Sequence, residues 1–316
     1  LLRPQDSVQW TLYLPDIFDI KGFAPCVGPE GECRQQADSL EKAYLQLTTG
    51  QVREGHAALL TLTGENPQFG PAWSALALSQ LVQSNKSEAL SSAQNGVKLS
   101  PDSATAQVVL SYAQQAGFNL DAALDAISRA IRIDPQNATA HLLKARLLFG
   151  RDEPEKAMRA VETARAIEPQ NGEVYSLQGY LLLARNRTGE AIDAFNRAIK
   201  LTPSNGEPHL GLALAFMRQG RVEDALESIT AAVLLEPQRS IFQSYWAKML
   251  YQIKRFDHAQ DLLDSAQELD PRDPTPFLYR AYILYDLNRE IEALESLNTA
   301  SRLNDNRAVY RSRYLL

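Results

Sequence analysis

The fold is decided by a unit of 34 residues, one copy of which reads GEVYSLQGYLLLARNRTGEAIDAFNRAIKLTPSN at residues 172–205. The proline near the end of this unit recurs every 34 residues along the chain, at Pro67, Pro101, Pro135, Pro169, Pro203, Pro237 and Pro271. A period that holds over about 200 residues means that one supersecondary unit is copied and stacked. The period therefore predicts an all-α repeat solenoid.

Counting back from each proline divides residues 36–307 into eight repeats, the last of which has Asp305 in place of proline. Position 1 of the repeat falls at residues 36, 70, 104, 138, 172, 206, 240 and 274. Each repeat is predicted to hold two amphipathic helices joined by a polar turn, such as Gln219-Gly220-Arg221. The proline stops the second helix, because it cannot continue a helix and forces the residue before it into an extended conformation.

Alanines recur in phase with the prolines on the second helix of the repeats. Position 20 carries Ala89, Ala123, Ala157, Ala191, Ala225, Ala259 and Ala293. Position 27 carries Ala130, Ala164, Ala198, Ala232, Ala266 and Ala300. Since seven residues are two helical turns, both sets lie on one face of the helix. We expect this face to be a site of close helix packing.

The two ends of the chain differ from the repeats. Residues 1–35 hold a period-two apolar pattern, with Val8, Trp10, Leu12 and Leu14 on one side, followed by a segment rich in Pro and Gly. We expect a strand and an irregular connector there. Residues 308–316 are predicted to begin a further helix. The chain starts at Leu1, and we expect it to be a piece of a longer protein.

The composition is that of a folded protein with an acidic balance. Hydrophobic residues make up 45% and charged residues 22% of the chain, which excludes wholesale disorder. The net charge is −6, with 38 acidic and 32 basic residues. Nucleic acid is therefore not expected as a partner, because phosphate binding needs a surplus of Lys and Arg. No apolar run in the sequence reaches the ~20 residues of a membrane-spanning helix.

These residues resemble the tetratricopeptide repeat family. In the repeat at 172–205 the family's pattern of bulky, small and proline residues is carried by Tyr175, Gly179, Ala191, Phe195, Ala198 and Pro203. In the repeat at 70–103 it is carried by Trp73, Leu76, Ala77, Ala89 and Pro101. The first repeat departs most, with Gly55 and Leu62 at the alanine positions. The resemblance implies a right-handed superhelix whose first helices line a concave groove.

A second resemblance concerns the ends of the chain. The segments VQWTLYLP at residues 8–15 and LNDNRAVYRSR at residues 303–313 are similar to parts of large exported bacterial repeat proteins with a FecR-like domain ahead of the repeats. This resemblance implies a place in the periplasm or cell envelope. A cytoplasmic location is the alternative.

Cys26 and Cys33 enclose a short segment with two glycines and one proline. The chain can turn back there, so a small disulfide loop is sterically reasonable, and export would favour it. Two free thiols are the alternative. A metal site is a poorer interpretation, because no further Cys or nearby His completes a ligand set.

No enzymatic activity or cofactor is predicted. The sequence holds no P-loop, dinucleotide-binding glycine motif, zinc motif or nucleophile elbow. His141 and His209 occupy equivalent positions two repeats apart, which is too far for one metal ion. Most such residues simply pack in helix faces.

The resemblance implies that positions 2, 5, 9 and 12 of each first helix face the groove. Position 9 carries Tyr44, Leu78, Tyr112, Arg146, Tyr180, Leu214, Lys248 and Tyr282, and position 12 carries Leu47, Leu81, Gln115, Phe149, Leu183, Met217, Tyr251 and Tyr285. The predicted binding residues are Tyr44, Leu78, Tyr112, Arg146, Phe149, Tyr180, Met217, Lys248, Tyr251, Tyr282 and Tyr285. The apolar ones would be anchors, with Arg146 and Lys248 orienting acidic groups. The alternative is that some of them complete packing between helices.

The sequence thus favours a non-catalytic scaffold that binds an extended or helical protein segment in an apolar, Tyr-rich groove. The occupant could be the chain's own residues 1–35 or a second copy. The Lys and Asn pattern with which some family members clamp a peptide carboxylate is missing. A mechanical spacer or assembly part of an envelope complex is the second hypothesis, and a glycan-binding groove is a third.

Overall fold

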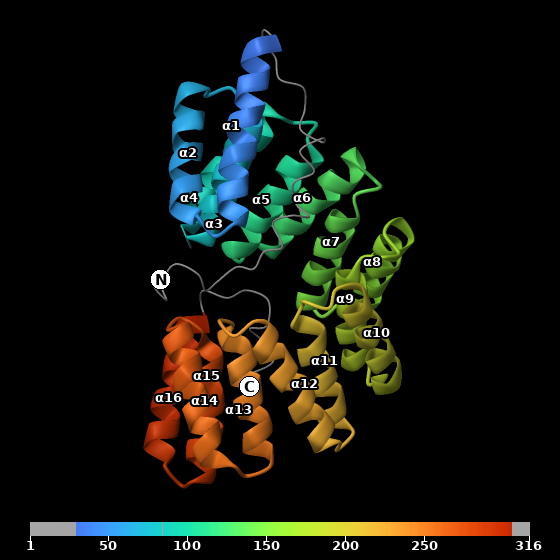
Figure 1. The fold of residues 1–316 in the computed structure, drawn as a ribbon, viewed down its shortest axis with the longest axis vertical. Coiled ribbons are helices and arrows are strands. Elements are labelled where there is room, and N and C mark those ends of the chain that lie inside the picture. Colours follow the sequence, from blue (N-terminus) through green and yellow to red (C-terminus); the bar gives the residue numbers. More distant parts are fainter. Residues whose placement is uncertain (1–29, 84, 305–316) are drawn as a thin grey trace. The chain divides into compact units, whose positions relative to one another are not determined.

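The computed structural model describes residues 30–83 and 85–304, which form sixteen helices and no strand (Figure 1). The predicted strand at residues 8–14, the further helix at residues 308–316 and Cys26 lie outside the described residues. Cys33 falls in a helix, but its side chain is also outside the description, so the disulfide stays a prediction.

The helices form eight helix–turn–helix repeats. The first helices are α1 (Glu30–Thr48), α3 (Gly70–Val82), α5 (Ala104–Ala116), α7 (Ala138–Gly150), α9 (Gly172–Ala184), α11 (Glu207–Arg218), α13 (Ser240–Gln252) and α15 (Pro274–Asp286). The second helices are α2 (Val52–Glu65), α4 (Lys86–Leu99), α6 (Leu120–Ile133), α8 (Pro154–Ile167), α10 (Thr188–Leu201), α12 (Val222–Leu235), α14 (Phe256–Leu269) and α16 (Glu290–Asn304).

The described residues fall into two compact units, an N-terminal unit of residues 30–147 and a C-terminal unit of residues 148–304. Within each unit the helices pack against their neighbours along the chain. In the C-terminal unit, for example, α11 packs on α12 and α13, and α13 packs on α14 and α15 (Figure 1). This neighbour-to-neighbour packing is what a repeat solenoid requires.

One boundary differs from the sequence prediction. Helix α1 begins at Glu30, six residues before the predicted start of the first repeat at residue 36, and so extends into the segment assigned to the connector. No proline interrupts residues 30–35, so nothing in the backbone chemistry stops the helix from continuing through them.

The periodic proline sets the end of each second helix, as predicted. Helices α2, α4, α6, α8, α10, α12 and α14 each end two residues before their proline.

The carbonyl oxygen of the periodic proline makes a recurrent contact with the side chain at position 4 of the next repeat. Trp73 Nε1 and Tyr175 Oη, both at position 4, donate to Pro67 O and Pro169 O at 2.9 Å, and His141 Nε2 lies 3.1 Å from Pro135 O. Position 4 thereby ties each of these first helices to the turn before it.

In the seven repeats whose inner turn the structure describes in full, the turn has a left-handed residue that was not predicted from the sequence. Position 15 has a positive φ in Gly50, Phe118, Asp152, Asn186, Gly220, Lys254 and Asn288. Two backbone bonds close the turn around it: Phe118 N donates to Gln115 O, and Asn119 N to Gln114 O. This is the Schellman arrangement that ends a helix. Its backbone bonds hold residues such as Phe118 in a conformation that usually favours glycine.

The alanines at positions 20 and 27 are buried in every repeat that carries them, as the sequence predicts. Ala225 and Ala232 on α12, for instance, share a core with Leu210, Ile229 and Phe242. The small alanine side chain lets the helices approach closely at these positions.

Phe195 on α10 is the one aromatic residue at its repeat position, and glycines make room for it. Its ring is fully buried. A Cβ atom on Gly211 of α11 would lie 2.3 Å from two ring carbons, and one on Gly179 of α9 would lie 2.5 Å from the ring. The aromatic ring and the two glycines therefore form one complementary set that joins α9, α10 and α11.

Ala225→Leu should lower the free energy of unfolding by about 1–3 kcal/mol, because three extra carbon atoms overpack a closed contact. The midpoint of urea unfolding measures the effect. Ala166→Leu is the matched control, since Ala166 is exposed on α8, also a second helix. Equal midpoints for the two variants would contradict the close-packing assignment.

Gly211→Ala should also lower the free energy of unfolding, by about 1–2 kcal/mol. The steric clash of the added methyl group with Phe195 outweighs the ~1 kcal/mol that alanine gains in helix propensity. In a Phe195→Leu background the same change should be neutral or stabilising. Gly189→Ala on α10 is the control, since a Cβ there meets nothing within 4 Å. A cost that is the same in both backgrounds would refute the complementary set.

Candidate partner-binding surface

The predicted binding residues all lie on first helices, but those of the N-terminal unit are mostly covered. Leu78 on α3 has no exposed surface, and Tyr44 on α1 is 9% exposed. Both belong to the hydrophobic core, and Tyr112 on α5 packs against it. Leu78 and Tyr44 therefore pack between helices, as the alternative interpretation held. Arg146 on α7 is exposed.

Tyr180, on α9 of the C-terminal unit, is half-buried and has contacts within the chain. Its ring meets the edge of Phe195 with the centroids 5.1 Å apart. Its hydroxyl donates to Glu207 O at 2.9 Å and lies 3.2 Å from Glu207 Oε2. The side chain therefore joins α9 to the start of α11, and its main role in this structure is packing between repeats.

A charged cluster beside Tyr180 is also satisfied internally. Arg239 Nη2 lies 2.5 Å from Glu207 Oε1, and Arg239 Nη1 lies 3.2 Å from Glu236 Oε2. Glu236 Oε1 accepts from Gly206 N at 2.7 Å, and the guanidinium stacks over Phe242 at 4.5 Å. Gly206 and Glu207 lie where α11 begins, and Glu236 and Arg239 lie in the turn between α12 and α13. The cluster joins these two places, so we assign it a structural role.

The exposed apolar residues of the predicted set gather on α11, α13 and α15. We call Met217, Lys248, Tyr251, Tyr282 and Tyr285 the aromatic surface. Tyr282 is 40% and Tyr285 67% exposed, and the other three are half-buried. These three helices pack in sequence within one unit (Figure 1), so the residues at positions 9 and 12 form neighbouring stripes.

The rings of this surface are ordered by contacts with one another. Tyr251 stacks on Tyr282 with centroids 6.4 Å apart and planes at 29°. Tyr282 also contacts Tyr279, at 6.2 Å, and Tyr251 contacts Phe256, at 5.9 Å. Such pairs restrict the rotation of each ring. A partner would thus meet aromatic faces that are already in place.

An ion pair fixes the hydroxyl of Tyr251. Lys254 Nζ lies 2.9 Å from Asp286 Oδ2, and this hydrogen bond is the main reason that the pKa of Asp286 is lowered. The Tyr251 hydroxyl also donates to Asp286. Burial, and then the bond to Asp286, raises the pKa of Tyr251. Lys254 lies over the rings of Tyr251 and Phe256, at 5.5 and 5.4 Å from their centroids.

Lys248 occupies a different environment. Its ammonium lies 5.4 Å from the ring centroids of both Tyr245 and Tyr279, within cation–π distance. Burial, and then the positive charge of Arg218, lowers the pKa of Lys248. Among the described residues no carboxylate forms an ion pair with it. The nearby Arg218 donates to the carbonyl of Leu183.

The residues that support this surface were not predicted from the sequence. Tyr245 and Tyr279 both occupy position 6, in the seventh and eighth repeats. The recurrence of tyrosine at this position was the signal that could have identified them. Lys254 and Asp286 are 32 residues apart and lie at positions 15 and 13 of successive repeats. Their pairing depends on the packing of α13 against α15, which no local pattern specifies.

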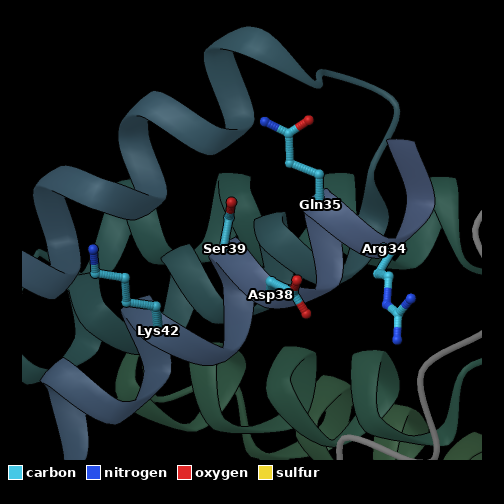
Figure 2. A pocket seen from close by; sticks show the side chains of 5 residues that line it. All are labelled: Arg34, Gln35, Asp38, Ser39 and Lys42. Atoms are coloured by element: carbon cyan, nitrogen blue, oxygen red, sulfur yellow. The ribbon is translucent and has the colours of Figure 1, made fainter. Parts of the chain in front are cut away.

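A second candidate is a hollow of about 360 Å³ along α1 (Figure 2). It is lined by Arg34, Gln35, Asp38, Ser39 and Lys42, all on one helix. Figure 2 shows these side chains spread along the helix rather than converging on one point. The hollow is therefore an open surface and lacks the enclosed, apolar character of a ligand site.

Two further properties of the described residues bear on function. None of the helices within residues 30–304 is long and apolar enough to cross a bilayer. In the same described part of the chain, no three His, Cys, Asp or Glu side chains are grouped so that they could hold a metal ion.

Known protein families match most of the repeats. One model described as a tetratricopeptide repeat matches residues 40–104, 74–138 and 210–274, which is more than half of the chain. A second tetratricopeptide repeat model matches residues 115–180, and a TPR repeat model matches residues 179–220. The matched ranges together run from residue 40 to residue 274.

Solved structures share the fold at low sequence identity. A thermophilic TPR protein of Thermus thermophilus is 24% identical, with a TM-score of 0.53 over 58% of this chain and 99% of that one. The Cut9–Hcn1 hetero-tetramer of APC/C gives 15% identity and a TM-score of 0.67, over 96% of this chain and 57% of that one. Yeast Tom70 gives 15% identity and a TM-score of 0.61, over 92% of this chain and 65% of that one.

No curated protein gives a significant match. The family models and the sixteen-helix repeat architecture agree with each other. The chain belongs to the tetratricopeptide repeat family.

Proposed function

We propose that this chain is a scaffold that binds a segment of a partner protein on the aromatic surface of α11, α13 and α15. The tetratricopeptide repeat fold suggests a protein–protein interaction scaffold. One solved structure with this fold, that of Cut9 with Hcn1, is itself an assembly. The proposal adds the place of binding and the character of the partner.

The observation that carries the proposal is the exposure of Tyr282 and Tyr285 beside half-buried Tyr251 and Met217. Exposed apolar side chains that are grouped in this way are typical of interaction sites, whereas single ones are ordinary. Tyrosine gives a large contact area at a low cost in side-chain entropy, and it is enriched among the residues that dominate interface energies. The ring contacts described above reduce that cost further.

The surface favours a segment with apolar side chains, either extended or helical. The stripes at positions 9 and 12 cross three successive first helices, so a bound segment would meet Met217, then Tyr251, then Tyr282 and Tyr285. Tyr44, Leu78 and Tyr180 have no part in this proposal, because their side chains are used in packing.

The test begins with the native partner, co-purified with the full-length protein from its own cells and identified by mass spectrometry. The double variant Tyr282→Ala/Tyr285→Ala should then weaken binding at least tenfold in isothermal titration, because two exposed anchors are lost. Unfolding midpoints should stay close to that of the parent protein, since both side chains are largely outside the core.

Leu234→Ala is the matched control, because Leu234 is an exposed apolar residue (76%) on the second helix α12. It should leave the affinity unchanged. If the tyrosine double variant also binds as tightly as the parent, the aromatic surface is not the binding site. That outcome would instead fit the mechanical spacer, which contacts its partners by other faces.

A further inference from the structure

Lys248 is a half-buried cation whose charge no described carboxylate balances. Its side chain lies between Tyr245 of its own helix and Tyr279 of α15, and the other charged group facing it is Arg218 of α11. A half-buried charge is costly unless it is paired, and a neighbouring charge of the same sign adds to the cost. The structure offers partial compensation only, through the two ring faces.

Three other cations near the aromatic surface have carboxylate partners. Lys254 bonds to Asp286, Arg280 to Asp264 at 2.5 Å, and Arg239 to both Glu207 and Glu236. Lys254 is paired although its side chain is 67% exposed, whereas the half-buried Lys248 has no such partner among the described residues. The neighbouring Arg218 also has no carboxylate there and bonds only to the carbonyl of Leu183.

We infer that Lys248 is the subsite for an acidic side chain, Asp or Glu, of the partner segment whose apolar residue packs on Tyr251 and Tyr282. This inference rests on the proposed function and specifies its ligand. The bound carboxylate supplies the missing counter-charge for Lys248 and relieves its repulsion with Arg218. The apolar neighbour covers the exposed ring of Tyr282.

The spacing on α13 restricts the ligand sequence. Lys248 and Tyr251 are three residues apart, which is about 4.5 Å along a helix axis. An extended segment advances about 3.3 Å per residue. Where an extended segment crosses α13, the residues that reach Lys248 and Tyr251 are therefore one or two positions apart.

The rest of the chain increases the selectivity of this site. A net charge of −6 disfavours non-specific binding of an acidic segment elsewhere on the protein. Charge complementarity at Lys248 therefore fixes the register of the segment as well as adding to its affinity.

The test uses a phage-displayed library of random 12-residue peptides, selected on the immobilised full chain. The parent protein should enrich peptides with Asp or Glu one or two positions from an aromatic or aliphatic residue. Lys248→Met keeps the apolar stem over the rings but removes the charge. It should still select apolar peptides, without the acidic residue. Lys200→Met, on the exposed side of α10, is the control and should select as the parent does.

A synthetic copy of the best peptide separates direct pairing from indirect effects. Replacing its acidic residue with the matching amide should weaken binding at least tenfold to the parent and less than twofold to Lys248→Met. In the free protein, NMR of ¹³C-labelled lysine should find the pKa of Lys248 below that of exposed lysines. The acidic peptide should raise this pKa, and its amide version should not.

The outcomes separate the two proposals. Apolar peptides selected without an acidic residue, or an amide effect of the same size in both proteins, overturn the inference and leave the proposed function standing. Peptides that bind equally well after Tyr282→Ala/Tyr285→Ala overturn the proposed function and the inference with it.

Discussion

The close approach of helices that meet through alanine is the constraint on which the rest of this structure depends. Positions 20 and 27 are buried wherever alanine occupies them, and this small side chain lets the helices approach at close-packed density. Where the chain does place a large ring at such a contact, at Phe195, the facing positions are Gly179 and Gly211. Close contacts through small residues thus recur along the chain. They pack each repeat on the next, so that the first helices follow one another in order.

The ordered stacking of the repeats brings residues that are far apart in the sequence onto one surface. Because α11, α13 and α15 follow one another at a constant offset, Met217, Tyr251, Tyr282 and Tyr285 come together although they are up to 68 residues apart in the sequence. The same offset places Lys254 beside Asp286 and Lys248 beside Tyr279. Aromatic contact area and charge are thereby combined on the rigid part of the molecule, since these residues lie on helices or in the tight turn between them.

How far the sequence predicts this structure depends on whether a signal is local. A proline beyond the first turn stops a helix through its own backbone geometry, so the seven periodic prolines predicted seven helix ends. Position 15 carries Gly, Asn or Asp in five of the seven described turns, which was a usable signal. Phe118 and Lys254 do not favour the left-handed conformation themselves, and there the backbone bonds of the turn impose it. Leu78 and Tyr282 share position 9, yet the first has no exposed surface and the second is 40% exposed. The position specifies the helix face, whereas exposure depends on side chains of neighbouring helices. The unpaired charge of Lys248 likewise depends on which carboxylates lie nearby, and no pattern within one repeat records it.

Each repeat packs only on its neighbours, and this has a mechanical consequence. The angle between successive repeats is set separately at each junction, and the distance from Met217 to Tyr285 changes with the angles at the two junctions between them. A segment that contacts both residues fits a single local curvature best. Binding and bending are then coupled, so that tension or compression along the solenoid would alter affinity, and a bound segment would stiffen α11, α13 and α15 against bending.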